Sequence, residues 1–169
     1  MIAMKDLIGK LAKPPVVVGA AVVTAIVQGR KPGEAARFLV GVPLTALATK
    51  VIKRLHPEYR PSFCDRKPRQ SFPSGHSASV TAYLLSLVDS CSAWWALPLV
   101  GAGVAMVNVS RVKNREHWIS DVVVGDLVGA VGALAGAIVA RVIAKTRRPS
   151  TSTDVTASRR NAPPSPFAT

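Results

Sequence analysis

Long stretches without charge alternate with short polar segments along the chain. Five stretches stand out, at residues 14–29, 38–49, 77–88, 90–110 and 118–140, with only Asp121 and Asp126 interrupting the last. Strictly alternating polarity is absent from them and Gly and Ala are frequent, which favours helices over strands. A helix needs about 20 residues to cross a hydrocarbon layer of ~30 Å, so the last two stretches suffice and the others need their flanks. The pattern predicts an all-α, polytopic transmembrane helical bundle of about five spans.

A soluble all-α protein with buried helices is the alternative, because short apolar stretches also occur in soluble cores. The stretches at 90–110 and 118–140 have no polar face to present to water, which favours a membrane. The composition agrees, since 49% of the residues are hydrophobic, only 5% are aromatic and the mean hydropathy is +0.27. At 169 residues the chain is expected to form a single domain.

The two ends of the chain differ from its middle. In residues 1–13, apolar side chains gather near one helical face and three lysines toward the other, which predicts a short helix lying in the membrane interface. No clear cleavage site follows, so this segment is expected to be retained. Residues 145–169 are rich in Pro, Ser, Thr, Ala and basic residues, which predicts a disordered basic tail. The membrane-embedded domain is therefore expected to cover residues 1–144.

Small residues form a stripe along the last apolar stretch. Its glycines are spaced three or four residues apart, at Gly125, Gly129, Gly132 and Gly136. This spacing places them on one side of a helix and lets a neighbouring backbone approach closely. We expect the stripe to pack within the molecule rather than against a second copy. Asp126 lies in the same stretch, and it is expected either to pair with a cation of the site or to be neutral.

Positive charge dominates the polar residues, with 22 Lys and Arg against 9 Asp and Glu and a formal net charge of +13. Nucleic-acid binding is not favoured, because the cations lie at the ends of the apolar stretches and no aromatic stacking surface accompanies them. Cys64 and Cys91 are too few for a disulfide scaffold or a cysteine zinc site. A non-catalytic basic membrane adaptor remains an alternative explanation of the charge.

Three polar clusters lie at the ends of the predicted spans, at residues 53–61, 73–76 and 110–121. The first two flank the loop between the second and third spans, and the third connects the fourth and fifth spans. Because two crossings separate these loops, all three clusters are expected to meet on one side of the membrane. Polar residues at a membrane are costly and usually serve a function, so the meeting point is the candidate site.

The residue types in these clusters suit a phosphate group. Lys53, Arg60 and Arg111 supply positive charge, and the Ser74 hydroxyl lies with the Gly75 amide where a helix is expected to begin. Cations and the amides of a helix N-terminus both bind compact oxyanions. The clusters therefore predict a phosphate-binding site.

Two histidines add reactive groups to this site. His117 and Asp121 are four residues apart, so the carboxylate can hold one ring nitrogen protonated while the other ring nitrogen acts as a nucleophile. His76 comes from a different segment and can protonate the leaving oxygen from the opposite side. This division of roles fits cleavage of a phosphate ester.

The three clusters closely resemble the signatures of the type 2 phosphatidic acid phosphatase superfamily, K-x6-RP, PSGH and SR-x5-H-x3-D, with every spacing kept. The resemblance implies a phosphohistidine at His117, oriented by Asp121, with His76 acting as acid and then as base. It also implies that no metal and no other cofactor is needed. The residues implied to hold the phosphoryl oxygens are Lys53, Arg60, Ser74, Gly75 and Arg111.

The resemblance further implies an integral-membrane lipid phosphate phosphatase. The implied substrates are polyprenyl diphosphate, phosphatidic acid, phosphatidylglycerol phosphate and decaprenylphosphoryl-5-phosphoribose, with polyprenyl-linked lipids the first choice. A lipid phosphotransferase, which would pass the phosphate to an alcohol, is an alternative use of the same site. A soluble vanadate-dependent haloperoxidase has a similar constellation, but the apolar stretches argue against it. The expected partners are the lipid substrate and the bilayer, with no nucleic acid.

The orientation in the membrane depends on which charges are counted. Most Lys and Arg residues fall on the site side, which by the positive-inside rule would place the site in the cytoplasm. Several of these cations are needed by the site, however, and the basic tail lies at the other end. Bacterial relatives in this superfamily often face outward. We therefore expect a bacterial cell (inner) membrane protein with its active site on the extracytoplasmic side.

Overall fold

The computed structural model describes residues 2–28, 32–61 and 70–146. Cys64, the loop cations of residues 66–69 and the tail beyond Thr146 lie outside the described residues, so the expectations for them stay predictions. Within the described ranges the chain forms helices and no strands. The prediction of an all-α bundle is confirmed.

Each apolar stretch corresponds to one α-helix, a short 3-10 helix lies within the fourth stretch, and a further helix precedes them. The elements are α1 (Ile2–Leu11), α2 (Pro14–Val27), α3 (Pro32–Leu55), α4 (Gly75–Cys91), a short 3-10 helix η1 (Trp94–Ala96), α5 (Leu97–Lys113) and α6 (Ile119–Thr146). α1 corresponds to the helix expected over residues 1–13. α6 includes Lys145 and Thr146, two residues that the composition assigned to the tail.

Three helical segments of the described chain are long and apolar enough to cross a membrane, at Gly33–Leu55, Trp94–Lys113 and Ile119–Thr146. These segments make the chain an integral membrane protein. α2 is a shorter apolar helix of 14 residues, and α4 has 17 residues and is more polar than α2. The five helices α2–α6 therefore match the five expected spans in number, while only three reach the length of a full crossing.

The helix α3 begins six residues before the uncharged stretch that predicted it. The added turn carries Glu34 and Arg37, and Arg37 is buried. Arg37 pairs with Glu34 at 3.2 Å and also forms an ion pair with Asp89 on α4. A paired charge can be buried at lower cost than an isolated one, which explains why charge did not end the helix here.

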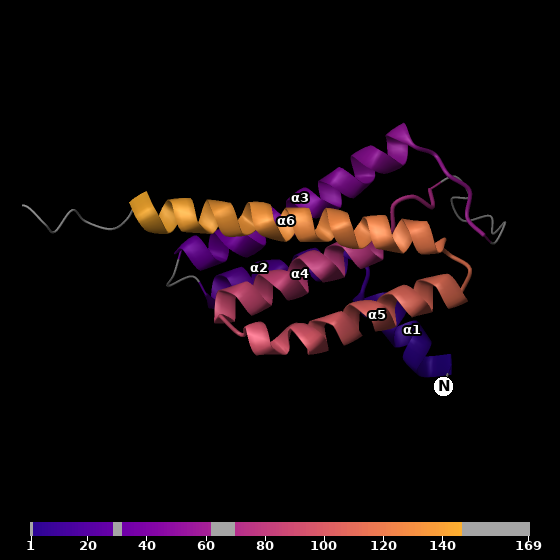
Figure 1. Cartoon of the computed structure of the whole chain (residues 1–169), viewed down its shortest axis with the longest axis horizontal. Helices are drawn as coiled ribbons and strands as arrows, with labels where there is room; N and C mark the ends of the chain where they lie inside the picture. Colours follow the sequence, from indigo (N-terminus) through magenta and orange to yellow (C-terminus); the bar gives the residue numbers. More distant parts are fainter. Residues whose placement is uncertain (1, 29–31, 62–69, 147–169) are drawn as a thin grey trace, which may run out of the picture.

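From α2 onward, successive helices run in opposite directions, and this places the polar clusters together. In Figure 1 the end of α3, the start of α4, the end of α5 and the start of α6 all lie at the right-hand end of the bundle, where α1 is also found. α6 packs against α3 and α4, and α5 lies at the edge beside α4 and α1. The expected meeting of the polar clusters on one side is confirmed.

The glycines of α6 bring it into backbone contact with two helices. A methyl group added at Gly125 would lie 2.6 Å from the carbonyl oxygen of Ser74, and one added at Gly129 would lie 2.9 Å from the Thr81 Cβ. At Gly132 the added group would lie 2.9 Å from the Gly41 carbonyl oxygen on α3. The stripe therefore packs within the molecule, as expected, with its first half against α4 and its second half against α3.

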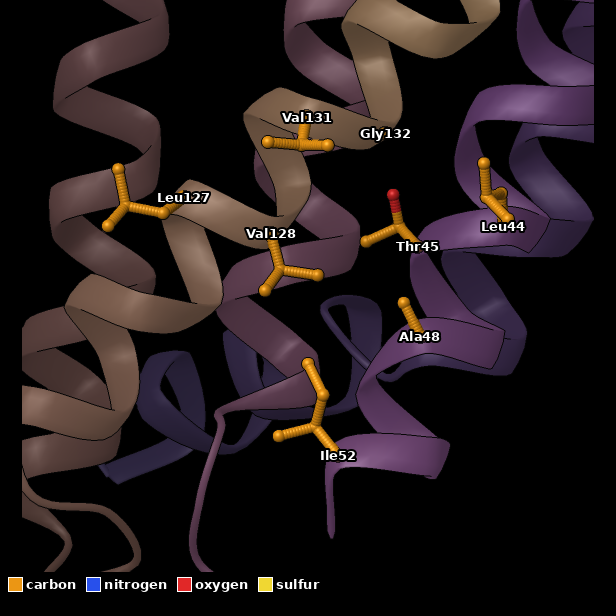
Figure 2. Close-up of a pocket in the computed structure, with 8 residues that line it drawn as sticks. All are labelled: Leu44, Thr45, Ala48, Ile52, Leu127, Val128, Val131 and Gly132. Carbon is orange, nitrogen blue, oxygen red and sulfur yellow. The ribbon is translucent and has the colours of Figure 1, made fainter. Parts of the chain in front are cut away.

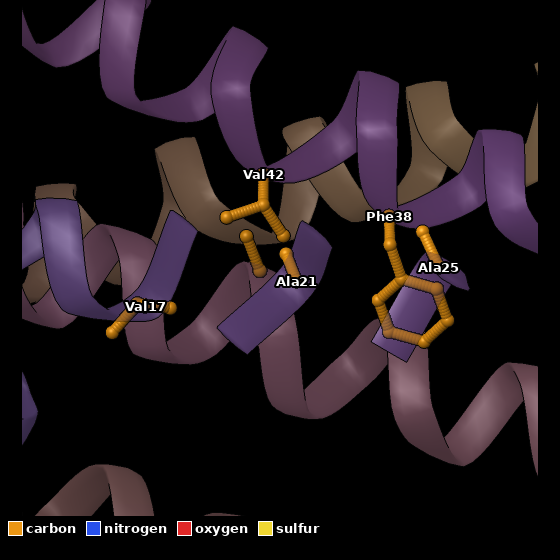
Figure 3. Close-up of a cluster of buried hydrophobic side chains, with 6 residues drawn as sticks. Val17, Ala21, Ala25, Phe38 and Val42 are labelled. Carbon is orange, nitrogen blue, oxygen red and sulfur yellow. The ribbon is translucent and has the colours of Figure 1, made fainter. Parts of the chain in front are cut away.

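A small apolar core holds α2 to this pair of helices. Figure 3 shows Val17, Ala21 and Ala25 of α2 facing Phe38 and Val42 of α3, and Ala82 of α4 belongs to the same cluster. Most of these side chains are small, so the three helices approach closely. The Phe38 ring packs tilted against Tyr83 of α4, with 6.0 Å between ring centres.

We expect Gly129→Leu to destabilise the bundle by about 1–3 kcal/mol, because the side chain would force α6 away from α4. Gly101→Leu is the matched control, since a methyl group at Gly101 would meet nothing within 4 Å. Thermal unfolding of both variants in the same detergent measures the difference. Equal melting temperatures would contradict close packing of α6 on α4.

Candidate active site

The three polar clusters converge at one end of the bundle. Lys53 is in the last turn of α3, His76 in the first turn of α4, and Arg111 in the last turn of α5. His76 interacts electrostatically with Arg111, His117, Arg60 and Lys53, residues from all three clusters. The sequence therefore brings two histidines and three cations into one region, as the parity of the helices requires.

His117 and Asp121 form a buried pair at the start of α6. His117 is 2% exposed and Asp121 is completely buried. Nδ1 of His117 lies 3.3 Å from Oδ2 of Asp121, so a proton on Nδ1 is donated to the carboxylate and Nε2 carries the free lone pair. This is the arrangement that the four-residue spacing predicts.

Asp121 also connects the second and third clusters. Its Oδ2 accepts a hydrogen bond from the Ser71 hydroxyl and one from the Trp118 backbone N–H at 2.9 Å. The Asp121 carbonyl oxygen accepts from the backbone N–H of Ser74 at 2.8 Å. Together with His117, these contacts fix the loop before α4 to the first turn of α6.

Ser71 is a site residue that the motif reading missed. It precedes the PSGH signature by two residues and is completely buried. Its backbone N–H donates to the Glu58 carbonyl oxygen at 3.0 Å, so it links residues 53–61 to Asp121. The sequence shows only a serine in the short polar segment before the PSGH signature. That position alone is weak evidence for a site residue, because the contact depends on how the loop folds.

Lys53 holds the same loop by its ammonium group. Nζ donates to the carbonyl oxygens of Gln70 at 2.8 Å and Ser71 at 3.2 Å. Lys53 also interacts electrostatically with Arg60 and Asp121. It therefore has a positioning contact in addition to its expected interaction with phosphate.

Two guanidinium nitrogens at the site are buried without a partner in the described part of the chain. These are the Nε atoms of Arg60 and Arg111. A buried N–H donor without an acceptor is unfavourable, and an oxyanion would satisfy it. Both residues therefore fit the expected phosphate-binding role.

Arg111 has a carboxylate partner that the sequence reading did not anticipate. One of its terminal nitrogens, Nη1, lies 2.7 Å from Oε2 of Glu116. Glu116 is one-third exposed, whereas Arg111 is almost fully buried. A phosphate that binds Arg111 must share or displace this carboxylate.

Ser74 caps α4. It is completely buried, and its Oγ accepts from the Ser77 backbone N–H at 3.4 Å and from the Ser77 hydroxyl at 2.9 Å. The cap fixes the helix N-terminus at which the Gly75 amide lies, and such termini attract anions. Direct contact of Ser74 and Gly75 with phosphate stays a prediction.

The environment of His117 sets its protonation. Burial lowers the pKa of His117 below its usual value, and the hydrogen bond with Asp121 acts in the opposite direction. The nearby cations Lys53 and Arg60 lower this pKa further. The imidazole is therefore held neutral, which is the form that can attack phosphorus.

Other polar residues lie outside this constellation. Asp126 accepts hydrogen bonds from Thr81 at 2.8 Å and from Asn108 at 2.6 Å, so it joins α4, α5 and α6 instead of pairing with a site cation. His56 is exposed just after α3. Cys91 is exposed at the end of α4 opposite the site.

Comparison with known proteins matches the PAP2 superfamily over residues 34–148. The chain belongs to the PAP2 superfamily. The matched range contains all three signatures, so the family resemblance read from them is confirmed.

One curated relative is an undecaprenyl-diphosphatase of Sulfolobus acidocaldarius, which is 31% identical to this chain over 98 residues. The alignment covers 55% of this chain and 47% of the relative, so the chain spans about half the length of that relative. No solved structure matches the chain.

We expect Glu116→Gln to tighten the binding of inorganic phosphate roughly fivefold, the equivalent of about 1 kcal/mol, because Arg111 loses a competing carboxylate in a partly solvent-exposed pair. Glu58→Gln is the control, since it removes the same charge from an exposed residue just after α3. Titration calorimetry in detergent measures both. Weaker binding by Glu116→Gln would show that Glu116 supports the anion site.

Proposed function

We propose that this protein is a lipid phosphate phosphatase that removes a terminal phosphate from a polyprenyl-linked or glycerolipid substrate through a phosphohistidine intermediate, without a metal. The observation that carries the proposal is the buried His117–Asp121 pair surrounded by cations. The carboxylate fixes Nδ1 of His117, which leaves Nε2 for the substrate. Membership of the PAP2 superfamily and the likeness to an undecaprenyl-diphosphatase support the same reaction.

In the first step, the Nε2 lone pair of His117 attacks phosphorus and the bond from phosphorus to the lipid oxygen breaks. His76 gives a proton to that oxygen as it leaves. Burial and the neighbouring cations lower the pKa of His76, and the negative charge of the bound phosphate offsets those cations and favours the protonated form. Asp121 stabilises the positive charge that develops on the imidazole. Lys53, Arg60 and Arg111, with the amides at the start of α4, hold the three equatorial oxygens.

In the second step, water attacks the phosphohistidine. His76 is now neutral and takes a proton from the water, while the phosphorus–nitrogen bond breaks and its electron pair returns to His117. Inorganic phosphate then leaves, with His76 again protonated and His117 neutral. All bonds and protons balance over the two steps, and no metal takes part.

We propose polyprenyl diphosphates as the first substrate class to test, since the Sulfolobus relative is named for one. Phosphatidic acid, phosphatidylglycerol phosphate and decaprenylphosphoryl-5-phosphoribose are the comparison substrates. We further propose a bacterial cell membrane location with the site on the extracytoplasmic side. The arrangement of helices supports this orientation, because the site and the C-terminal end of α6 lie at opposite ends of the bundle. The basic tail that follows α6 in the sequence would then start on the cytoplasmic side, as the positive-inside rule favours.

We expect His117→Ala to abolish phosphate release, with a loss of roughly 10³-fold or more, because no other group can form the intermediate. His56→Ala is the matched control, since this exposed histidine lies at the same end of the bundle. Phosphate release is measured over the substrate panel with a chelator present. A fully active His117→Ala variant would indicate that the activity comes from a contaminant and that this protein is not catalytic. Transfer of the phosphate group to an added lipid alcohol would indicate a phosphotransferase.

We expect the acid limb of kcat/KM to lie below the ordinary histidine value near 6.5, because burial lowers the pKa of His117. Asp121→Asn removes the interactions that raise this pKa, so its acid limb is expected to move to still lower pH while kcat falls roughly 10²–10⁴-fold. A pH profile of both enzymes on one substrate tests the sign. An acid limb that moves to higher pH in Asp121→Asn would refute the assigned pair.

A further inference from the structure

An apolar groove opens between four helices of the bundle. It has a volume of about 330 Å³ and is lined by residues of α1, α2, α4 and α5. Its walls are almost entirely apolar, and the hydroxyl of Tyr83, one of the lining residues, shares a hydrogen bond with Thr24 at 3.0 Å. Leu11 and Val16 on its rim are about half exposed. The groove is therefore open sideways, toward the space that lipid occupies around a membrane helix.

Two helices carry residues of both the groove and the site. On α4, Val80, Tyr83 and Leu84 line the groove at four, seven and eight residues after His76. Residues at these spacings share one helical face. On α5, Val107 lines the groove one turn before Arg111.

The helix α1 touches both the site and the groove. Gly9 lies directly against the guanidinium of Arg111, with 2.5 Å between Nη2 and the position that a Cβ would take. Ile8 and Leu11, on either side of it in the sequence, line the groove. α1 therefore forms one wall of a path that leads from a phosphate-binding cation to apolar surface.

A second groove of similar size is lined by other helices. Figure 2 shows it between α3 and α6, with Ala48 and Ile52 facing Val128, and its volume is about 300 Å³. Val128 follows Asp121 by seven residues, so this groove lies on the face of α6 that bears the nucleophile pair. One apolar groove thus shares a face of α4 with His76, and the other shares a face of α6 with Asp121, the partner of His117.

In-line displacement distinguishes the two grooves. A nucleophile that attacks phosphorus expels the leaving group from the opposite side, and in the proposed reaction the leaving oxygen receives its proton from His76. The rest of the lipid is attached to that oxygen, and in a polyprenyl diphosphate it consists of the second phosphate group followed by the hydrocarbon chain. This part of the lipid must therefore start on the side of His76.

We infer that the groove between α1, α2, α4 and α5 holds the hydrocarbon chain of the substrate, and that the chain is a single polyprenyl chain. The inference rests on the proposed function, because it uses His76 as the acid for the leaving group. The volume is at the small end of ligand pockets, which span about 300–1,000 Å³. It suits one chain beside the helix better than the two chains of a glycerolipid.

Two matched substitutions test the assignment. Ala20→Phe fills the groove beside α2, and Ala48→Phe fills the groove between α3 and α6; both alanines are half-buried. The enzyme is reconstituted in phosphatidylcholine vesicles, and kcat/KM is measured for undecaprenyl diphosphate and for the short-chain geranyl diphosphate. Val16→Trp, at the exposed rim of the first groove, serves in place of Ala20→Phe if that variant does not fold.

We expect Ala20→Phe to lower the ratio of long-chain to short-chain kcat/KM about tenfold or more, and Ala48→Phe to leave it unchanged. The reverse result would place the chain between α3 and α6. A ratio that neither variant changes would mean that the chain stays in the bulk bilayer. Both outcomes overturn the inference.

Photo-crosslinking keeps the inference testable if the wild-type protein hydrolyses neither lipid. The probe is a polyprenyl phosphonate with a diazirine in its chain, and labelled peptides are identified by mass spectrometry. Labelling of Leu11, Val80 or Leu84 that Ala20→Phe prevents would support the groove even where the proposed phosphatase activity fails. Labelling confined to α3 and α6 would refute the groove assignment, whatever the activity.

Discussion

The buried carboxylate of Asp121 is the group on which the arrangement of the site depends. It receives the His117 ring, the Ser71 hydroxyl and the Trp118 amide on one oxygen, while its own carbonyl oxygen receives the Ser74 amide. A buried carboxylate is stable only when its charge and lone pairs are satisfied. The contacts that satisfy Oδ2 of Asp121 therefore hold the residues before α4, the start of α4 and the start of α6 in one position, while Oδ1 is buried without a hydrogen-bond partner in the described part of the chain.

That position requires α6 to approach α4 very closely, and the glycines of α6 make this possible. Gly125 is one turn beyond Asp121, at the place where α6 meets the Ser74 carbonyl group. A side chain there would push α6 outward and separate Asp121 from its donors on the loop. The hydrogen bonds at the end of the bundle therefore depend on the close backbone packing of α6 against α4.

The sequence predicted the elements of the site better than their connections. The four-residue spacing of His117 and Asp121 and the parity of the apolar stretches both follow from helix geometry, so the pair and the meeting of the clusters could be expected. Three other features of the site could not be predicted in this way, because they depend on how loops fold back across the helix ends. These are the role of Ser71, the ion pair of Glu116 with Arg111, and the contact of α1 with Arg111. The early start of α3 was missed for a related reason, since Arg37 finds its partner Asp89 on a distant segment.

Polar contacts also occur at two further levels of the bundle, and they explain how α5 is held in place. At the end far from the site, Arg37 of α3 and Arg141 of α6 both face Asp89 of α4, whereas α5 takes no part. Between that level and the site, Asp126 joins Thr81 of α4 to Asn108 of α5. Because α5 packs only lightly on α6, this hydrogen-bonded carboxylate is its main polar tie to the rest of the bundle. Asn108 lies one turn before Arg111 on α5. The hydrogen bond between Asn108 and Asp126 therefore also helps to position the Arg111 side chain at the site.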